Sequence, residues 1–174
     1  MVANSDTERV GGLVLVSCET ENNYPPGRAG QVAALSGWMP GGFSVMRAAL
    51  LSPALRRLPL AYGQMSKKGV PDALVRRWVE PLKRKEIRRD LGRYVRDVRR
   101  GRRQMRAATP QLRTFEKPVL VVWDAEGPMM PNSEGRALAG SFPNSRYVEL
   151  PDCFTLIPID QPRALAREIE LFAG

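Results

Sequence analysis

The sequence predicts an α/β fold in which a short parallel sheet of about three strands carries a helical insertion. Short apolar runs near residues 10–17, 118–123 and 146–150 are typical of strands buried in a parallel sheet. A helical pattern follows the second run and another follows the third, which gives the alternation of an α/β protein. The hundred or so residues between the first two runs read as proline-punctuated helices without a further strand.

The first strand is expected within RVGGLVLVSC, residues 9–18, because its apolar centre is followed directly by polar residues. The turn-rich segment ENNYPPGRAGQ then leaves the sheet. Such an excursion is longer than a crossover between parallel strands needs, so part of it should form a lid above the carboxyl ends of the strands. Helices are predicted in the insertion near residues 30–37, 43–51, 71–79, 84–100 and 102–114.

The last sixty residues predict strand, helix, strand and helix in that order. Between the second and third strands, NSEGRALAGSF predicts a short helix that Asn132 caps. After the third strand we expect Asp160 to cap a final helix. That helix has Leu165, Ile169 and Phe172 at the spacing of one buried stripe.

Length and composition fit one globular domain or part of one. The chain has 174 residues, of which 43% are hydrophobic and 26% are charged, so wholesale disorder is not expected. The chain has no run of 18 apolar residues, so no membrane span is predicted. Its polar start also lacks the apolar stretch of a secretory signal. The sequence therefore predicts a cytoplasmic protein without a membrane partner.

The chain contains no histidine and only two cysteines, Cys18 and Cys153. Ser-His, Cys-His and His-metal arrangements built from this chain alone are thereby excluded. Nothing nearby would deprotonate a thiol in the Cys-His manner, so both cysteines are interpreted as free, small hydrophobic residues. We expect neither a cofactor nor a metal ion.

The positive charge is concentrated in residues 76–106, which hold 14 Lys and Arg against four acids, whereas the rest of the chain holds 13 against 14. A polyanion-binding surface is one interpretation. The favoured alternative is the solvated face of a packed helix, because apolar residues recur at helical spacing and acids precede arginines by three positions. The apolar stripe consists of Ile87, Leu91, Tyr94, Val95 and Val98.

The loops that follow the predicted strands resemble a known family. PVLVVWDAEGPMMP and FPNSRYVELPDCFTLIPIDQP are similar to the C-terminal third of the α/β-hydrolase superfamily, and ANSDTERVGGLVLVSCE resembles the end of its nucleophile helix and its sixth strand. The resemblance implies a partial α/β-hydrolase fold, with residues 1–18 and 115–174 as the core portion and residues 19–114 as the cap. It also implies descent from hydrolases of esters or carbon–carbon bonds.

The catalytic positions of that family are altered in this chain. There is no G-x-S-x-G nucleophile elbow. Asp124 stands where the family usually has Gly, Gly127 stands where it has its catalytic Asp, and Glu126 lies beside that position. The family's Gly-His pair falls on Phe154 and Thr155, and a threonine hydroxyl is no general base near neutral pH.

Asp124, Glu126 and Thr155 are therefore the candidate catalytic positions, all of them degenerate. The structural alternative is a solvated acid turn at Asp124 and Glu126 and a packing role for Thr155. The hypothesis for activity is a truncated chain that is inactive when isolated. The alternative function is a non-catalytic module that binds nucleic acid or an anionic surface through the basic helix.

Partner expectations follow from the cap and from the incomplete sheet. A small apolar, ester-like substrate could bind beneath the cap, although ordinary packing between cap helices explains the same residues. A sheet that ends at its first strand exposes an edge, which favours self-association or a complementing upstream segment. The residues considered for the substrate pocket are Trp38, Met39, Phe43, Met46 and Trp78.

Overall fold

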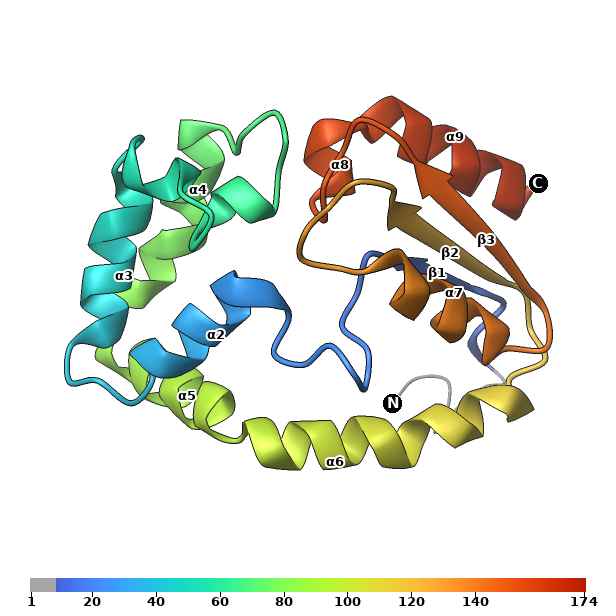
Figure 1. The fold of residues 1–174 in the computed structure, drawn as a ribbon, viewed down its shortest axis with the longest axis horizontal. Helices are drawn as coiled ribbons and strands as arrows, with labels where there is room; N and C mark the ends of the chain where they lie inside the picture. Colours follow the sequence, from blue (N-terminus) through green and yellow to red (C-terminus); the bar gives the residue numbers. More distant parts are fainter. Residues whose placement is uncertain (1–8) are drawn as a thin grey trace.

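The computed structural model describes residues 9–174 (Figure 1). Most of the segment that resembles the end of a nucleophile helix lies outside these residues. Within the described part, three strands form one parallel sheet in the order β1-β2-β3. The strands are β1 (Leu13–Val16), β2 (Val119–Asp124) and β3 (Ser145–Leu150). The three-stranded parallel sheet predicted from the apolar runs is confirmed.

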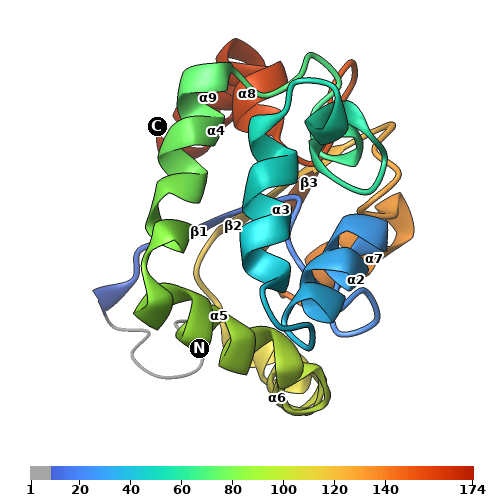
Figure 2. The same ribbon diagram turned by 90° about the vertical axis from the view of Figure 1, so that its left-hand side faces the viewer.

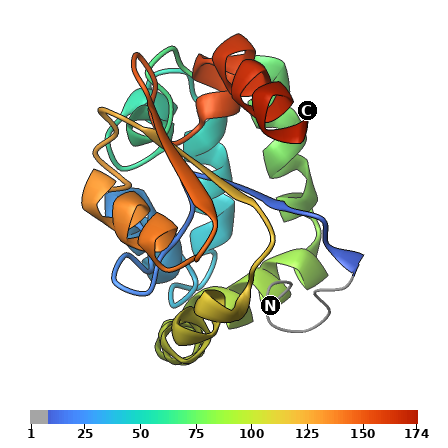
Figure 3. The ribbon, with the colours of Figure 1, turned by 90° about the vertical axis from the view of Figure 1, so that its right-hand side faces the viewer.

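The central strand β2 is buried along its whole length because both faces of the sheet are covered. On one face, Val121 and Trp123 pack in a cluster that includes Phe142, directly after helix α7 (Asn132–Gly140). On the other face, Leu120 and Val122 pack with residues of α8 (Ile157–Asp160) and α9 (Pro162–Ala173) (Figure 3). The predicted stripe of α9 belongs to this second cluster.

The insertion is helical, as predicted, and α2 to α5 lie beside the sheet (Figures 1 and 2). It has a core of its own around the buried Val70, Val75, Val79 and Leu82. Helix α6 runs along one side of the molecule and leads toward β2 (Figure 1). The elements are α2 (Gly27–Ser36), α3 (Gly42–Leu51), η2 (Leu55–Arg57), η3 (Tyr62–Gln64), α4 (Asp72–Val79), η4 (Glu80–Lys83), α5 (Lys85–Arg96), α6 (Val98–Ala108) and η5 (Thr109–Thr114).

The prediction of one continuous basic helix over residues 84–100 is wrong. The backbone leaves the helical region at Asp97, with φ −92° and ψ 33°, and this residue separates α5 from α6. The next predicted helix, 102–114, begins earlier than expected and ends in the 3₁₀ turn η5. The first strand is shorter than predicted.

Both predicted helix caps are wrong. Pro131 is the N-cap of α7, so Asn132 is the first helical residue, and its amide donates to the carbonyl of Ala125 at 3.4 Å. Gln161 is the N-cap of α9. Asp160 instead ends α8, and its carboxylate accepts hydrogen bonds from other segments, which are described below.

Candidate functional site

The loops that carry the candidate residues meet at one edge of the sheet, because the carboxyl ends of parallel strands lie together. Ser17 follows β1, Asp124 ends β2 and Pro151 follows β3. A loop of the insertion approaches the same edge, where the backbone N–H of Leu156 donates to the carbonyl of Met65 at 2.7 Å. The cap and the sheet are joined here by direct hydrogen bonds.

Asp124 is fully buried beside Ser17, so the expected solvated position of this acid is wrong. The hydroxyl of Ser17 donates to Oδ1 of Asp124 at 2.6 Å, and the backbone N–H of Asp124 donates to the same hydroxyl at 3.2 Å. Ser17 has a φ of 30°, an unusual value for a residue other than glycine. Burial raises the pKa of Asp124, although the Ser17 hydrogen bond opposes this shift.

The side chain of Asp124 occupies space that a side chain at position 127 would need. A Cβ atom built on Gly127 would lie 1.6 Å from Oδ2 of Asp124 and 2.7 Å from its Cγ. The aspartate side chain is short, buried and tied to Ser17, so it has little room to move away. The acid at 124 and the glycine at 127 are therefore coupled by packing.

Glu126 points to the cap loop and is exposed. The ammonium of Lys67 donates to Oε2 of Glu126 at 2.7 Å and lies 3.0 Å from Oδ1 of Asp152. The backbone N–H of Asp152 donates to Oε1 of Glu126 at 3.3 Å. The hydrogen bond from Lys67 lowers the pKa of Glu126, which favours the ionised carboxylate.

Thr155 makes no side-chain hydrogen bond to either of these acids within the described residues. Its Oγ1 is buried and has no hydrogen-bond partner within residues 9–174. Asp124 bonds to Ser17, and Glu126 bonds to Lys67 and Asp152. The structure thus brings the three candidate positions to one edge of the sheet without joining them by hydrogen bonds.

Asp160 has a role that the sequence did not predict. Its buried carboxylate accepts from the Ser66 hydroxyl at 2.7 Å and from the backbone N–H groups of Lys67, Lys68 and Phe154 at 2.8, 3.0 and 3.0 Å. Burial opposes ionisation, but these hydrogen bonds together lower its pKa. No local pattern could reveal this, because the Ser66 partner lies 94 positions away in the sequence.

Neither cysteine has the surroundings of a reactive thiol. The Cys153 thiol is buried and donates to the carbonyl of Leu150 at 3.2 Å. Burial, assisted by the charges of Asp124 and Asp160, raises its pKa to about 11. Burial also raises the pKa of Cys18. Across residues 9–174, no cluster of Cys, Asp or Glu has the grouping needed to hold a metal ion.

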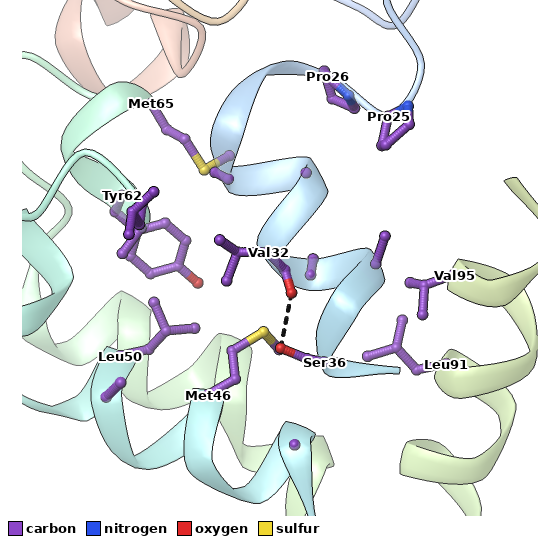
Figure 4. A pocket seen from close by; sticks show the side chains of 18 of the residues that line it. Pro25, Pro26, Val32, Ser36, Met46, Leu50, Tyr62, Met65, Leu91 and Val95 are labelled. Atoms are coloured by element: carbon purple, nitrogen blue, oxygen red, sulfur yellow. Dashed lines mark hydrogen bonds between the residues drawn. The ribbon is translucent and has the colours of Figure 1, made fainter. Parts of the chain in front are cut away.

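An apolar pocket of about 600 Å³ lies between α2, α3 and α5 (Figure 4). It extends to Met129, in the loop after β2 that also carries Asp124 and Glu126. The apolar stripe predicted in the basic helix contributes Leu91, Tyr94, Val95 and Val98 to its wall. These residues line a cavity in addition to packing the helix.

Two of the five residues considered for the pocket, Met39 and Met46, line it. Phe43 is buried, and Trp78 packs edge-on against Tyr62, with ring centroids 5.9 Å apart. Trp38 is 68% exposed and lies beside Met39 in the chain. The packing interpretation therefore holds for Phe43 and Trp78, and the pocket interpretation holds for the two methionines.

Comparison with known proteins gives one family and several related folds. A family model described as alpha/beta hydrolase fold matches residues 1–162. Among solved structures, a meta-cleavage product hydrolase from Pseudomonas fluorescens is 18% identical, with a TM-score of 0.66, and an esterase from Thermogutta terrifontis is 19% identical, with a TM-score of 0.55. The alignments cover 95% and 96% of this chain but 56% and 57% of those chains.

The chain thus spans little more than half the length of these solved structures. No match was found among curated protein sequences. Within residues 9–174, none of the helices combines the length and apolarity needed to cross a membrane.

Proposed function

Because the chain belongs to the alpha/beta hydrolase fold family, we propose that it binds a small apolar, ester-like ligand and does not hydrolyse it as an isolated chain. One observation carries this proposal. The position that matches the family's catalytic histidine is Thr155, and the whole chain contains no histidine. A threonine hydroxyl can neither accept a proton usefully near neutral pH nor return it to a leaving group.

The remaining groups at this edge do not replace the missing base. Asp124 is buried against Ser17, and its raised pKa reflects an environment that penalises the charged form. Glu126 is held by Lys67, and its lowered pKa makes it a weaker proton acceptor. An upstream segment that supplied a serine nucleophile in trans would still meet Thr155 in place of a base.

Ligand binding is supported by the pocket between α2, α3 and α5. Its volume of about 600 Å³ is that of a small-molecule site, and its wall is formed almost entirely by aliphatic, methionine and tyrosine side chains. Met129 connects it to the loop that follows β2. An apolar ligand in this pocket lies next to the altered acid loop, where its ester group finds no nucleophile–base pair.

The test combines turnover with binding. The purified chain is incubated with p-nitrophenyl acyl esters of increasing length, and the release of nitrophenol is expected to equal that of buffer. Turnover that falls when Asp124, Glu126 or Thr155 is substituted would overturn the inactive assignment, whereas turnover that survives these substitutions indicates a contaminant. Binding is measured by the fluorescence of N-phenyl-1-naphthylamine.

A bulky side chain in the pocket provides the matched variant. Ala33 lines the pocket and Ala166 is exposed on α9, so Ala33→Trp is expected to abolish dye binding and Ala166→Trp to leave it unchanged. Equal dye binding by both variants would contradict the assigned site. Comparable thermal transitions of the two variants establish that both are folded.

A second candidate function, binding of nucleic acid, is favoured by the exposed arginines of α6. Arg99, Arg103 and Arg106 are exposed and make no ion pair or side-chain hydrogen bond within residues 9–174. Other arginines of the basic segment are used internally: Arg88 donates to the carbonyl of Leu82, Arg96 to that of Gly37 and Arg102 to that of Tyr24.

This distribution limits how many phosphates α6 can neutralise. Three contacts predict a log–log salt slope of roughly −3 on duplex DNA, whereas seven contacts predict roughly −6, at about 0.9 per phosphate. Fluorescence anisotropy of a labelled duplex over a salt series measures the slope. Binding that is unchanged after Arg99→Glu and Arg103→Glu would remove this candidate.

A further inference from the structure

We propose that the mouth of the apolar pocket is a docking surface for an anionic lipid membrane. The surface, here called the apolar rim, consists of large side chains that line the pocket and are at the same time exposed to solvent: Met39, Val45, Leu55, Leu58, Leu60 and Tyr94. It goes beyond the ligand-binding proposal and does not depend on it.

The exposure of the rim is unusual for a surface in water. Val45 is 71% exposed, Tyr94 is 62% exposed and Met39 is 57% exposed, although each belongs to the wall of one cavity. Val45 lies on α3, Tyr94 lies on α5, and Met39 lies in the turn between α2 and α3. Exposed apolar side chains that converge on one opening mark an interaction site.

The charge around the rim indicates the kind of partner. Residues 22–71, which contribute most of the rim, contain six Lys or Arg and no Asp or Glu. Arg57 lies between the rim residues Leu55 and Leu58 in the chain, is exposed and makes no ion pair within the described residues. Arg56 pairs with Asp72, and Lys67 pairs with Glu126 and Asp152, so Arg57 supplies an unpaired positive charge beside the rim. An apolar surface that carries such a cation fits the hydrocarbon boundary and negative headgroups of an anionic leaflet.

Other features argue for lipid in preference to a second copy of this chain. Two copies joined through their rims would bring Arg57 of each copy to the same interface, where like charges repel. Trp38, which is 68% exposed, precedes Met39 of the rim, and tryptophan favours the interface between headgroups and acyl chains. The cavity behind the rim offers an apolar space that is continuous with such a surface.

A lipid partner departs from the expectation of no membrane partner, which is based on the lack of a spanning segment. A peripheral surface needs no such segment. It is also distinct from the basic face of α6, whose proposed binding of polyanions would rest on charge alone.

The experiment measures co-sedimentation of the full chain with vesicles. We expect binding to phosphatidylglycerol vesicles at low salt, little binding to phosphatidylcholine vesicles, and a blue shift of tryptophan emission on binding. Val45→Asp and Leu58→Asp are each expected to weaken binding about tenfold, because each removes one inserted apolar side chain. Leu171→Asp is the matched control, since the exposure of Leu171, 63%, lies between those of Leu58, 47%, and Val45, 71%, but Leu171 lies on α9 and does not line the pocket.

The charge component has its own pair of variants. Arg57→Gln is expected to weaken binding to phosphatidylglycerol vesicles about fivefold, the effect of one cation near an anionic leaflet. Arg163→Gln, on the exposed side of α9, is expected to leave it unchanged. Circular dichroism spectra identical to that of the unmodified chain establish that each variant is folded.

Four results would overturn the proposal. One is the absence of binding to either kind of vesicle, and another is equal binding to both kinds. The third is binding that ignores the rim variants but is lost when Arg99 and Arg103 are changed, which would assign the vesicle contact to α6. A dimer that the rim variants disrupt would make the rim a contact between copies and would equally contradict a lipid partner.

Discussion

The side chain of Asp124 fills the space that a side chain at position 127 would need, so only one of the two positions can carry a side chain there. Adding a Cβ at 127 brings it within 1.6 Å of the carboxylate of Asp124, so we expect Gly127→Ala to destabilise the chain by about 2–3 kcal/mol. In an Asp124→Gly background the same change meets free space and is expected to cost less than about 1 kcal/mol. Urea unfolding of the four proteins gives the coupling energy, and additive effects would refute the steric explanation.

Two buried aspartates are expected to affect stability with opposite dependence on pH. The pKa of Asp124 is raised in the folded chain, so its contribution to stability is fully present below its unfolded pKa of about 3.9 and is lost as pH rises through the folded value. The pKa of Asp160 is lowered, so its contribution is present above about 3.9 and is lost as pH falls through the folded value.

Asp124→Asn and Asp160→Asn separate these two effects. Relative to Asp124→Asn, the unmodified chain should become less stable as pH rises from about 4. Relative to Asp160→Asn, it should become less stable as pH falls below about 4. Free energies of unfolding from urea titrations across pH 3 to 8 provide the measurement. Slopes of the same sign for both comparisons would contradict the assigned burial and hydrogen bonding.

Asp124 and Asp160 also show which features cannot be predicted from the sequence. A carboxylate directly after a strand is normally solvated, and the sequence places Asp124 just beyond the predicted strand of residues 118–123. In the structure Asp124 ends β2, is buried, and accepts a hydrogen bond from Ser17, 107 positions away. Asp160 was expected to cap the helix that follows it, but the cap loop provides three of its hydrogen bonds. Such partners are set by the tertiary fold and leave no local signal.

At the scale of elements, the strands and most helices follow from hydrophobic periodicity, because β2 and α9 bury the residues that their patterns indicate. The break at Asp97 was missed because both α5 and α6 are rich in arginine, and their composition does not change at the junction. The family resemblance of the loops after β2 and β3 agrees with the matching family model.

The edge of β1 supports a prediction about association. Leu13 donates its backbone N–H to Pro118, just before β2, and Ser17 donates to Val122 of β2, so by alternation the N–H groups of Val14 and Val16 face away from the sheet. We propose that the chain self-associates through this edge, and Val14 is 37% exposed there. Val14→Pro removes an outward donor and is expected to reduce association, measured by size-exclusion chromatography with light scattering.

Leu15→Pro is the matched control for this strand. Its N–H should lie on the β2 side, so the substitution is expected to lower the thermal midpoint, whereas Val14→Pro should leave it within a few degrees. A chain that is monomeric at all concentrations would contradict self-association. Unchanged association of Val14→Pro would place the contact on another surface.

At the scale of the whole molecule, the hydrogen bonds of the Asp160 carboxylate link the insertion to the loop that follows β3. The carboxylate binds the loop of Ser66, Lys67 and Lys68 on one side and Phe154 on the other. Asp160→Asn should therefore increase amide hydrogen exchange at residues 66–69 and 154 by tenfold or more, since hydrogen bonds to a charged group contribute about 1.5–3 kcal/mol each. Glu170→Gln, at an exposed carboxylate on α9, serves as the control.

Exchange that rises throughout the chain in Asp160→Asn would show a loss of global stability and no specific fastening of the cap. Exchange confined to residues 66–69 and 154 would locate the effect at the junction. Peptide-resolved mass spectrometry distinguishes the two outcomes.

The packing of Asp124 against Gly127 restricts the order in which such a loop can change by single substitutions. Starting from glycine at 124 and aspartate at 127, the pattern that the resemblance to the family implies, gaining Asp124 first would place two side chains where the backbone leaves room for one. Losing the acid at 127 first passes through a loop with two glycines, which fits without a clash. A mutational path through folded intermediates therefore loses the acid at 127 before the buried Ser17–Asp124 pair can form.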